Sequence, residues 1–382
     1  MPNLEYMREI YETLHRHPEL SEQEYRTADL IATELEHLGF AVRRNIGGTG
    51  VVGVLEFGGP GRILALRCDM DALPVQEESG VAFASQNPGV MHACGHDSHM
   101  ATVLGVCRLA AQQRERFAGT LLAVFQPAEE VVVGAWAMLE QGLFAEHQPD
   151  RIVGIHNWPS LPAGSIGLQA GPITAFADRF RVTFQGAGGH GAVPHKTADP
   201  IAMAAAGVQN AFALAQRSTD SSSPQTLSFG LIQGGTRFNV IPSQVVAEGT
   251  VRTISSEDQE KMIANLHRAF AASAKLYGGD YDLEYSRGVP AVVNNRDCVE
   301  ELAGIFAAEI PEVPVRTHGL ASLIGEDFTY YLEKIPGVLL LIGSGQAGAV
   351  NELHHPSFLV PPKTLETGCR ALFSIVKGYL EE

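Results

Sequence analysis

Four short apolar runs, each followed at once by polar residues, constrain this chain more than any other feature. They are apolar on both faces, which is typical of strands buried between two layers of helices in a parallel sheet. Helical patterns expected at 3–16, 21–38, 296–308 and 362–380 supply such layers. We predict an α/β fold with a mixed, largely parallel sheet flanked by helices, whose central strands span 62–68, 120–125, 151–155 and 337–342.

Acidic residues and histidines lie at or beyond the carboxyl end of each of these strands. Open α/β sheets bind their ligands in the crevice at that edge. Loop polarity would explain any one of these residues, but it does not easily explain all of them together. The residues are Asp69 and Asp71, Glu129 and Glu130, His156, and, after a short loop, His354.

The segment 91–99 concentrates one thiol, three imidazoles and one carboxylate in nine residues. An apolar helical pattern follows it, with Asp97 or Ser98 expected as the N-cap. Cys94 and His96 should therefore lie close to the positive end of a helix, which favours a thiolate metal ligand. Together with Glu130, His156 and His354 they make five candidate ligands of the kinds that divalent transition metals take.

Five ligands exceed the four of one tetrahedral ion. Two divalent ions that share Cys94 as a bridge are the simplest arrangement, and paired ions are a known hydrolytic design. Glu129 and Glu130 are neighbours, so one can bind metal while the other serves as general base. An acidic turn exposed to solvent is the alternative interpretation of this pair.

The pattern changes between about 178 and 289. Strands are expected at 178–185, 226–233, 245–253 and 280–285, with helices at 199–216 and 257–277. This βαββαβ order is that of a ferredoxin-like unit. We predict a first domain formed by 1–177 plus 290–382, and an inserted ferredoxin-like α+β domain at 178–289 that dimerises or acts as a lid.

The formal net charge of −16 argues against nucleic acid or an anionic membrane surface as a partner. It is compatible with a small-molecule substrate. The five cysteines have no spacing typical of a disulfide framework, so a reducing cytoplasm is expected. The first residues lack the pattern of a signal peptide.

At this point the chain resembles a known family. It is similar to the dinuclear metallopeptidases and amidohydrolases that include hippurate hydrolase, aminoacylase and glutamate carboxypeptidase, in the branch that acts on N-acyl amino acids. Matching motifs span nearly the whole chain in order. They lie at 14–20, 69–74, 92–99, 125–130, 154–157, 189–195, 239–242, 325–328 and 354–356.

The resemblance implies two divalent ions (Zn, Mn, Co or Ni), held by Cys94, His96, Glu130, His156 and His354, and a homodimer or dimer-based oligomer. It implies a hydrolase of linear amides that splits N-acyl amino acids, with metal-bound water as nucleophile. The further roles it implies are Glu129 as general base, Asp69 orienting a ligand, His190 polarising the scissile carbonyl, and Asn239 and Arg252 holding the substrate carboxylate.

The chain also departs from that family. Wider relatives carry a ligand histidine where Arg67 stands, and His96 is expected to replace it. For His190, Asn239 and Arg252, turn capping or strand-end hydrogen bonding is the structural alternative. Other functions stay open: a metallo-dipeptidase or carboxypeptidase, an amidase with Cys94 as nucleophile activated by His92 or His96, or a metal-dependent binding protein.

Overall fold

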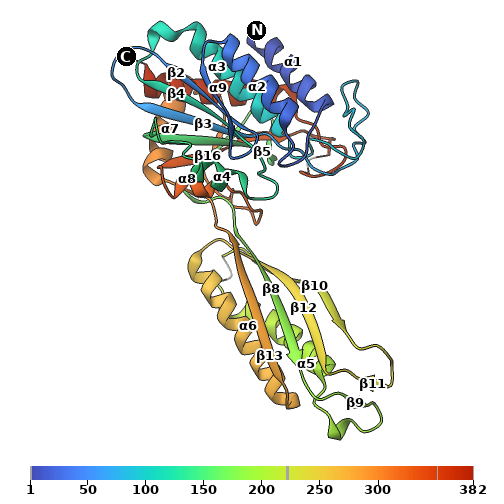
Figure 1. Cartoon of the computed structure of the whole chain (residues 1–382). Coiled ribbons are helices and arrows are strands. Elements are labelled where there is room, and N and C mark those ends of the chain that lie inside the picture. The colour runs from blue at the N-terminus through green and yellow to red at the C-terminus, as the bar shows by residue number, and fades with distance from the viewer. Residues whose placement is uncertain (1, 221–222, 351, 382) are drawn as a thin grey trace. The chain divides into compact units, whose positions relative to one another are not determined.

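The computed structural model describes residues 2–220, 223–350 and 352–381 (Figure 1). The chain forms two compact units. Unit 1 consists of Met1–Gly171, Val292–Leu320 and Asp327–Glu382, and unit 2 of Pro172–Ala291 and Ala321–Glu326. The expected second domain at 178–289 falls inside unit 2, which also takes in the segment Ala321–Glu326. Backbone hydrogen bonds from Ala175 to Ile324 and from Ser322 to Ile173 attach that segment.

Unit 1 is built on an eight-stranded sheet with the order β1-β2-β4-β3-β5-β16-β6-β15. The central strands β4, β3, β5 and β16 run parallel, whereas β1 and β2 extend one edge antiparallel. This confirms the predicted mixed, largely parallel sheet. The strands are β1 Ala41–Ile46, β2 Gly50–Glu56, β3 Ile63–Asp69, β4 Thr120–Gln126, β5 Arg151–Pro162, β6 Ile166–Gly167, β15 Val315–Arg316 and β16 Gly337–Gly345.

Alternate residues of the central strands feed the main hydrophobic core, together with apolar faces of α1, α2, α3, α7 and α9. Leu64 and Leu340, from two of those strands, are fully buried. Burial of this much apolar surface is the dominant stabilising term of such a fold. The helices of unit 1 are α1 Pro2–Arg16, α2 Tyr25–His37, α3 His96–Gln112, η1 Arg114–Arg116, α4 Gly134–Glu140, α7 Arg296–Glu309, α8 Thr329–Leu332 and α9 Pro362–Leu380.

Helix α3 begins two or three residues earlier than predicted. Its N-cap is Gly95, with a left-handed φ of 81°, and His96 already belongs to the first turn. The prediction of Asp97 or Ser98 as N-cap is therefore wrong. A side chain on Gly95 would lie 2.4 Å from the Asn157 amide nitrogen, so the close approach of β5 requires glycine here.

Helix α2 begins at Tyr25, so the expected start at Ser21 is wrong. The Ser21 hydroxyl donates instead to Asp71, at 2.7 Å. The buried Glu24 carboxylate accepts hydrogen bonds from the Thr49 hydroxyl and from the backbone N–H of Ala128. Long-range partners thus replace the local cap at this helix start.

Unit 2 has a four-stranded antiparallel sheet in the order β10-β12-β8-β13, with α5 and α6 packed against it. The element order β8-α5-β10-β12-α6-β13 confirms the ferredoxin-like pattern. Its elements are β8 Phe176–Gln185, β9 Gly189–His190, η2 Pro194–Lys196, α5 Pro200–Ser218, β10 Gln225–Gly234, β11 Val240–Ile241, β12 Gln244–Thr253, α6 Ser256–Tyr277 and β13 Asp280–Val289. The short strands β7 Gly171–Pro172 and β14 Val293–Asn294 pair with each other.

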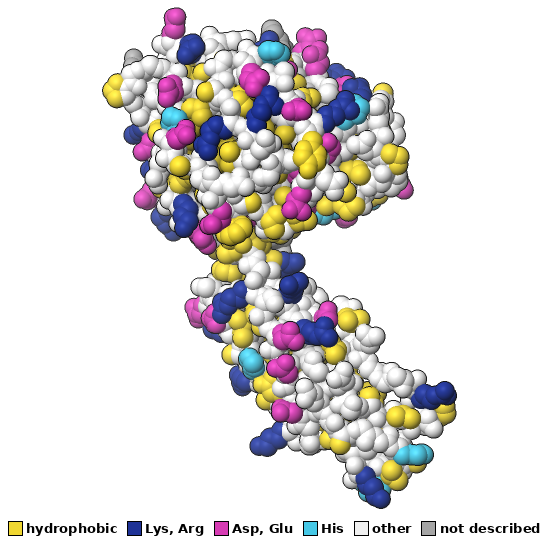
Figure 2. Space-filling view, viewed as in Figure 1, with side chains coloured by type: hydrophobic (Ala, Val, Ile, Leu, Met, Phe, Trp, Pro, Cys, Tyr) yellow, Lys and Arg dark blue, Asp and Glu magenta, His cyan; other side chains and the backbone are white. Residues whose placement is uncertain are grey.

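Acidic and basic side chains are interspersed over the face of each unit seen in Figure 2. Among the described residues, none of the helices has both the length and the apolarity needed to cross a bilayer.

Candidate metal centre

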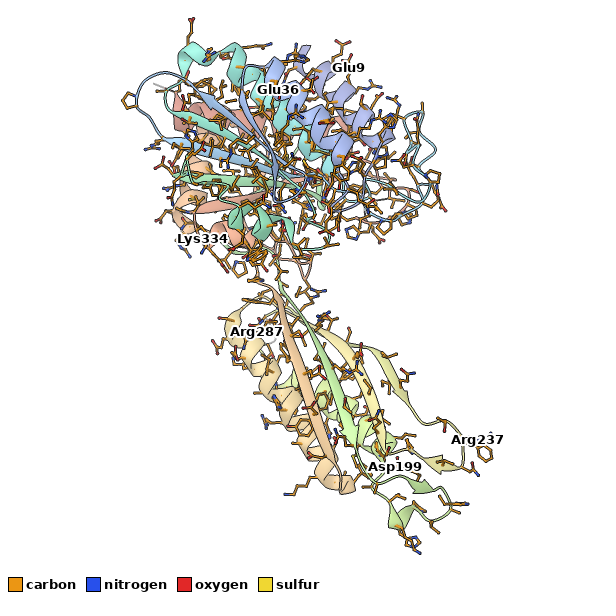
Figure 3. The ribbon with its side chains drawn as sticks, in the orientation of Figure 1. Glu9, Glu36, Asp199, Arg237, Arg287 and Lys334 are labelled. Carbon is orange, nitrogen blue, oxygen red and sulfur yellow. The ribbon has the colours of Figure 1, made fainter. Side chains whose placement is uncertain are left out.

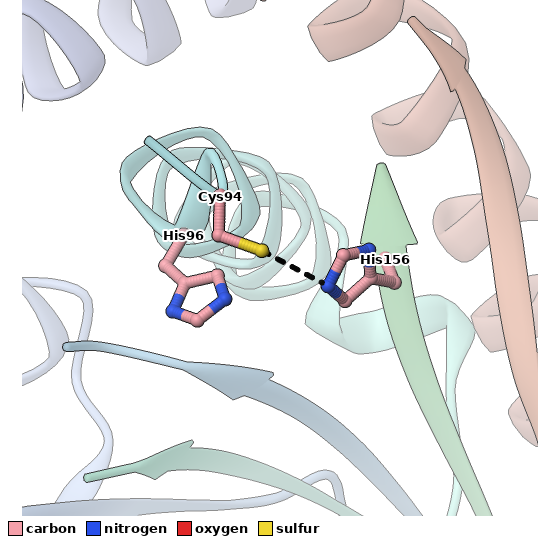
Figure 4. Close-up of side chains that lie close together, drawn as sticks. All are labelled: Cys94, His96 and His156. Carbon is pink, nitrogen blue, oxygen red and sulfur yellow. Dashed lines mark hydrogen bonds between the residues drawn. The ribbon is translucent and has the colours of Figure 1, made fainter. Parts of the chain in front are cut away.

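The structure brings the five candidate ligands and Glu129 together at the carboxyl edge of the unit 1 sheet. Cys94 Sγ lies 3.5 Å from His156 Nε2, with His96 beside them (Figure 4). Several groups of His, Cys, Asp and Glu side chains here have potential ligand atoms within 4.8 Å of one another, and three of them contain only the candidate ligands and Glu129. They are Cys94–His96–His156, Cys94–Glu130–His354 and His96–Glu129–Glu130.

Two buried atoms in these clusters support the presence of a cation. His96 Nε2 and Glu130 Oε1 are shielded from solvent and have no hydrogen-bond partner among the described residues. They lie 3.8 Å apart, beyond hydrogen-bonding distance. Buried polar atoms are rarely left unpaired, because desolvation costs on the order of 1–3 kcal/mol. One nitrogen and one carboxylate oxygen facing the same point therefore fit a divalent ion.

Asp71 orients two of the candidate ligands. Its backbone carbonyl accepts a hydrogen bond from His96 Nδ1 at 2.9 Å, which leaves Nε2 as the ligand atom. Its side chain accepts a hydrogen bond from the Glu130 backbone N–H at 3.0 Å. Sequence reasoning noted Asp71 only as a polar residue after a strand. The Asp-x-Asp spacing was the available signal, because residues two apart along a strand point to the same side of the sheet.

Asp69 was expected to orient a metal ligand, but its strongest contacts are with two residues outside the expected set. Its carboxylate accepts from His99 Nδ1 at 2.6 Å and from Arg67 Nη1 at 3.1 Å. It lies 3.8 Å from His96 Nε2. Burial raises the pKa of Asp69, but His96, His99 and Arg67 overcome this and hold it well below its usual range.

Arg67 is enclosed by hydrogen-bonding partners, so it can be a buried cation rather than a metal ligand. The side chain is fully buried. It donates to Gln126 at 2.8 Å and to Asp327 at 3.2 Å, in addition to Asp69. A buried guanidinium between two carboxylates is compensated in charge and in hydrogen bonds. Arg67 is therefore a fixed cation next to Asp69, which itself lies 3.8 Å from the candidate ligand His96.

The loop that carries Glu129 and Glu130 is held at three backbone N–H groups by buried carboxylates. Glu24 accepts from Ala128, Asp71 from Glu130, and Asp327 from Ala135, at 2.9, 3.0 and 3.0 Å. Ala128 and Val132 have left-handed φ values of 52° and 61°. Such backbone is unfavourable for a β-branched residue and persists only where the surroundings enforce it. The positions of both glutamates are thus fixed by the fold.

The electrostatics of the cluster are those of a site built for cations. Burial lowers the pKa of His96, but Asp69, Glu130 and Asp71 raise it to about 10. Burial raises the pKa of Glu130 to about 7, and burial with Glu130, Glu129 and Asp69 raises the pKa of the Cys94 thiol well above its ordinary value. A bound divalent ion would displace these protons, since ligands must be deprotonated.

His354 reaches the cluster from the loop after β16. Its Nε2 lies 3.5 Å from Glu130 Oε1, and its backbone N–H donates to the Ala93 carbonyl at 2.8 Å. Its backbone is left-handed, with φ 65°. About half of its side chain is exposed, so it marks the open side of the cluster.

His190 and Asn239 belong to unit 2, where both are exposed. His190 is in β9, which pairs with β11, and the Gly191 N–H donates to the Asn239 carbonyl. The Ala192 N–H donates to His190 Nδ1 at 3.0 Å. That contact places the proton on Nε2, which is left as a donor.

Arg252 lies at the opposite end of unit 2 from Asn239. Asn239 precedes β12, whereas Arg252 is near the end of that strand, opposite Ala177. At ~3.3 Å per residue the strand between Gln244 and Arg252 spans roughly 26 Å. Figure 3 shows the same separation, with Arg237 at one end of unit 2 and Arg287 at the other. The resemblance implied that Asn239 and Arg252 hold the same substrate carboxylate. With this separation, the two residues of one chain cannot both reach it.

Comparison with known proteins agrees with this geometry. The model of peptidase family M20/M25/M40 matches residues 65–378. The chain is 36% identical over 358 residues to the N-acetylcysteine deacetylase of Bacillus subtilis (strain 168), covering 92% of this chain and 91% of the relative. It is 39% identical over 282 residues to the N-acyl-L-amino acid amidohydrolase of Geobacillus stearothermophilus, covering 74% and 76%.

Among solved structures, a dinuclear metal-binding peptidase of the M20 family from Bacillus subtilis superposes with a TM-score of 0.86 at 32% identity, over 98% of each chain. The matched range 65–378 contains Arg67 and all five candidate ligands, from Cys94 to His354. The chain belongs to peptidase family M20/M25/M40.

Proposed function

We propose that this protein is a metal-dependent amidohydrolase that cleaves N-acyl amino acids into a carboxylic acid and a free amino acid. The observation that carries the proposal is the pair Glu129–Glu130. Glu130 lies in one cluster with Cys94 and His354 and in a second with Glu129 and His96, where Glu129 Oε2 lies 3.9 Å from His96 Nε2. One carboxylate is therefore available to bind metal and its neighbour to accept a proton.

The proposed ligands of two divalent ions are Cys94, His96, Glu130, His156 and His354, with Cys94 shared. Ions bound there would supply Lewis-acid chemistry, polarising an amide carbonyl and lowering the pKa of a water. Glu129 accepts the proton of the attacking water and passes it to the leaving amine. The similarity to a dinuclear metal-binding relative supports the number of ions. The element could be Zn, Mn, Co or Ni.

The proposed substrate is a small molecule, an amide between an acyl or aroyl group and an amino acid with a free carboxylate. Two relatives named for N-acyl amino acid substrates support it. His190 donates from Nε2 to the developing oxyanion, and Arg252 binds the substrate carboxylate. Because Asn239 and Arg252 lie at opposite ends of unit 2, we propose a homodimer in which two chains supply them. Five free, buried cysteines support a cytoplasmic location.

The test is a metal-supplemented screen of N-acetyl, N-benzoyl and indole-acetyl amino acids, with dipeptides and C-terminally blocked peptides as competing classes. Turnover of an N-acyl amino acid is expected, with close to two metal equivalents per chain by elemental analysis. Faster turnover of peptides would support a dipeptidase or carboxypeptidase instead. Metal content fixed at zero or one would exclude the shared Cys94.

A cysteine-nucleophile amidase is the second candidate, because Cys94 Sγ lies 3.5 Å from the His156 ring. The expected partners His92 and His96 do not make this contact: both ring nitrogens of His92 are buried without a hydrogen-bond partner among the described residues. This candidate predicts inhibition by alkylation and full activity in chelator. The metal-dependent candidate predicts loss of activity in chelator and recovery on adding metal.

A further inference from the structure

His99 lies in helix α3, fully buried, and the proposed mechanism gives it no role. Its ring is next to the rings of the two proposed histidine ligands His96 and His156. The ring centroids are 5.4 Å from that of His96 and 5.0 Å from that of His156. A histidine so close to a metal cluster would be expected to bind metal, so its hydrogen bonds decide what it does.

Both ring nitrogens of His99 are occupied by protein groups. Nδ1 is 2.6 Å from Asp69 Oδ1, and Nε2 accepts the backbone N–H of Asn157 at 2.9 Å. Because an N–H donates to Nε2, that nitrogen carries the lone pair, and the single proton sits on Nδ1. His99 is thereby a neutral ring in one fixed tautomer, and no lone pair is left for an ion.

Asn157 continues the chain of contacts to a metal ligand. Its backbone carbonyl is 2.8 Å from His156 Nδ1, which donates to it. The His156 proton is therefore on Nδ1, and Nε2 faces Cys94 as the ligand atom. The two backbone groups of one residue thus connect His99 with His156.

The side chain of Asn157 reaches the other metal-binding segment. Its amide donates to the Gly95 carbonyl at 3.2 Å and to the Ser98 hydroxyl at 2.8 Å. Gly95 lies between Cys94 and His96. Asn157 therefore joins strand β5 to the loop that supplies the thiolate.

Arg67 anchors the other end of the chain through Asp69. The Asp69 carboxylate has one oxygen on His99 and the other on Arg67, and both partners are fully buried. Asp69 is therefore fixed as a hydrogen-bond acceptor for His99. The connected chain is Arg67, Asp69, His99, Asn157 and His156.

We propose that His99 is a positioning residue for the metal centre: held by Asp69 and Arg67, it fixes the Asn157 peptide, and through it the His156 ring and the Cys94 loop. The proposal rests on the proposed metal-dependent function. It makes His99 neither a ligand nor a proton carrier. Partners of this kind typically change metal affinity by about 10–100-fold when removed.

The test compares two replacements of His99 in the full chain. Glutamine can accept from Asn157 through Oε1 and donate to Asp69 through Nε2, so His99→Gln keeps both hydrogen bonds. Leucine is of similar size and can do neither. The readout is the dissociation constant for Co²⁺, measured by competition with a chromophoric chelator, alongside the thermal midpoint of the metal-free protein.

We expect His99→Leu to weaken Co²⁺ binding by about 10–100-fold, and His99→Gln to stay within about threefold of wild type. A residue that only fills volume would give the reverse order, since leucine suits a buried site better than glutamine; that result overturns the proposal. Equal affinity for all three proteins overturns it as well. If His99→Leu does not fold, His99→Asn, which is too short to reach both partners, takes its place with the same expectation.

Failure of the proposed function and failure of the His99 proposal give different results. A wild-type protein that binds no Co²⁺ would refute the metal centre itself. A wild type that binds Co²⁺ while the variants do not differ would refute only the role of His99.

Discussion

The metal cluster of unit 1 and the His190 region of unit 2 are organised in opposite ways. In unit 1 the candidate groups are mostly buried, and carboxylates or backbone groups orient them. In unit 2, His190 and Asn239 are exposed; His190 is in β9, and Asn239 directly precedes its partner strand β11. A preorganised cluster suits an ion that must be coordinated in one geometry. An exposed donor suits a group that meets its partner only when substrate or a second chain arrives.

The largest expected effect separates roles inside the buried cluster. Glu129→Gln keeps the shape of the side chain but removes the proton acceptor, so kcat should fall by ~10²–10⁴ with metal content intact. Glu130→Gln should lose both activity and metal, because it removes a ligand. Steady-state kinetics and elemental analysis on the same preparations distinguish them. Metal loss in the Glu129 variant alone would mean that the two roles are reversed.

The next effect tests the exposed region. His190→Ala should lower kcat by ~10²–10³, the usual cost of removing one oxyanion donor, without changing metal content. An unchanged kcat would show that His190 takes no part in the reaction and only accepts the hydrogen bond from the Ala192 N–H.

Mixed dimers sharpen this comparison. If His190 serves the partner's site, mixing inactive Glu129→Gln chains with His190→Ala chains should restore part of the activity, because one site then has both groups. Heterodimers demonstrated by differently tagged chains, yet inactive, would place His190 in its own chain's site or outside the reaction.

A third prediction concerns the support of the buried cluster. His15 is buried between Asp97, at 2.6 Å, and Glu77, at 3.1 Å. Burial lowers the pKa of His15, but the two carboxylates raise it from 6.5 to about 9. The raised pKa should contribute roughly 3 kcal/mol to folding stability below pH 6.5, and this contribution is lost as pH rises through 9.

Urea unfolding of wild type and His15→Gln at several pH values measures that contribution. The difference in stability should be largest near pH 6 and should shrink between pH 7 and 10. A difference that does not change with pH would show that His15 is neutral in the folded protein.

The smallest effect concerns the substrate carboxylate. Arg252 is half-buried, and burial lowers the pKa of its guanidinium. Amidating the carboxylate of a good substrate should lower kcat/KM by about tenfold or more, because a paired Arg–carboxylate contact is lost. In Arg252→Met the free acid and the amide should be turned over alike. A wild-type enzyme that does not discriminate between them would rule out this role of Arg252.

Local patterns were sufficient to predict the sheet, the ferredoxin-like unit and the residues that converge at the metal cluster. Strand composition and helical period are set by residues close in sequence, and parallel strands bring their ends to one edge whatever the details. Glu130 and His156 follow from that rule, whereas Cys94 was identified from the segment 91–99 that precedes a helix.

Tertiary structure alone decided which side chains hold that cluster. Arg67 donates a hydrogen bond to Asp327, 260 residues away, and Ser21, at the expected start of a helix, donates one to Asp71, 50 residues on. The tertiary structure also placed Asn239 before the start of strand β12 and Arg252 near the end of that strand. A sequence pattern states which groups an element presents, but a hydrogen bond depends on distances of a few tenths of an ångström, and only the packing of distant segments fixes those.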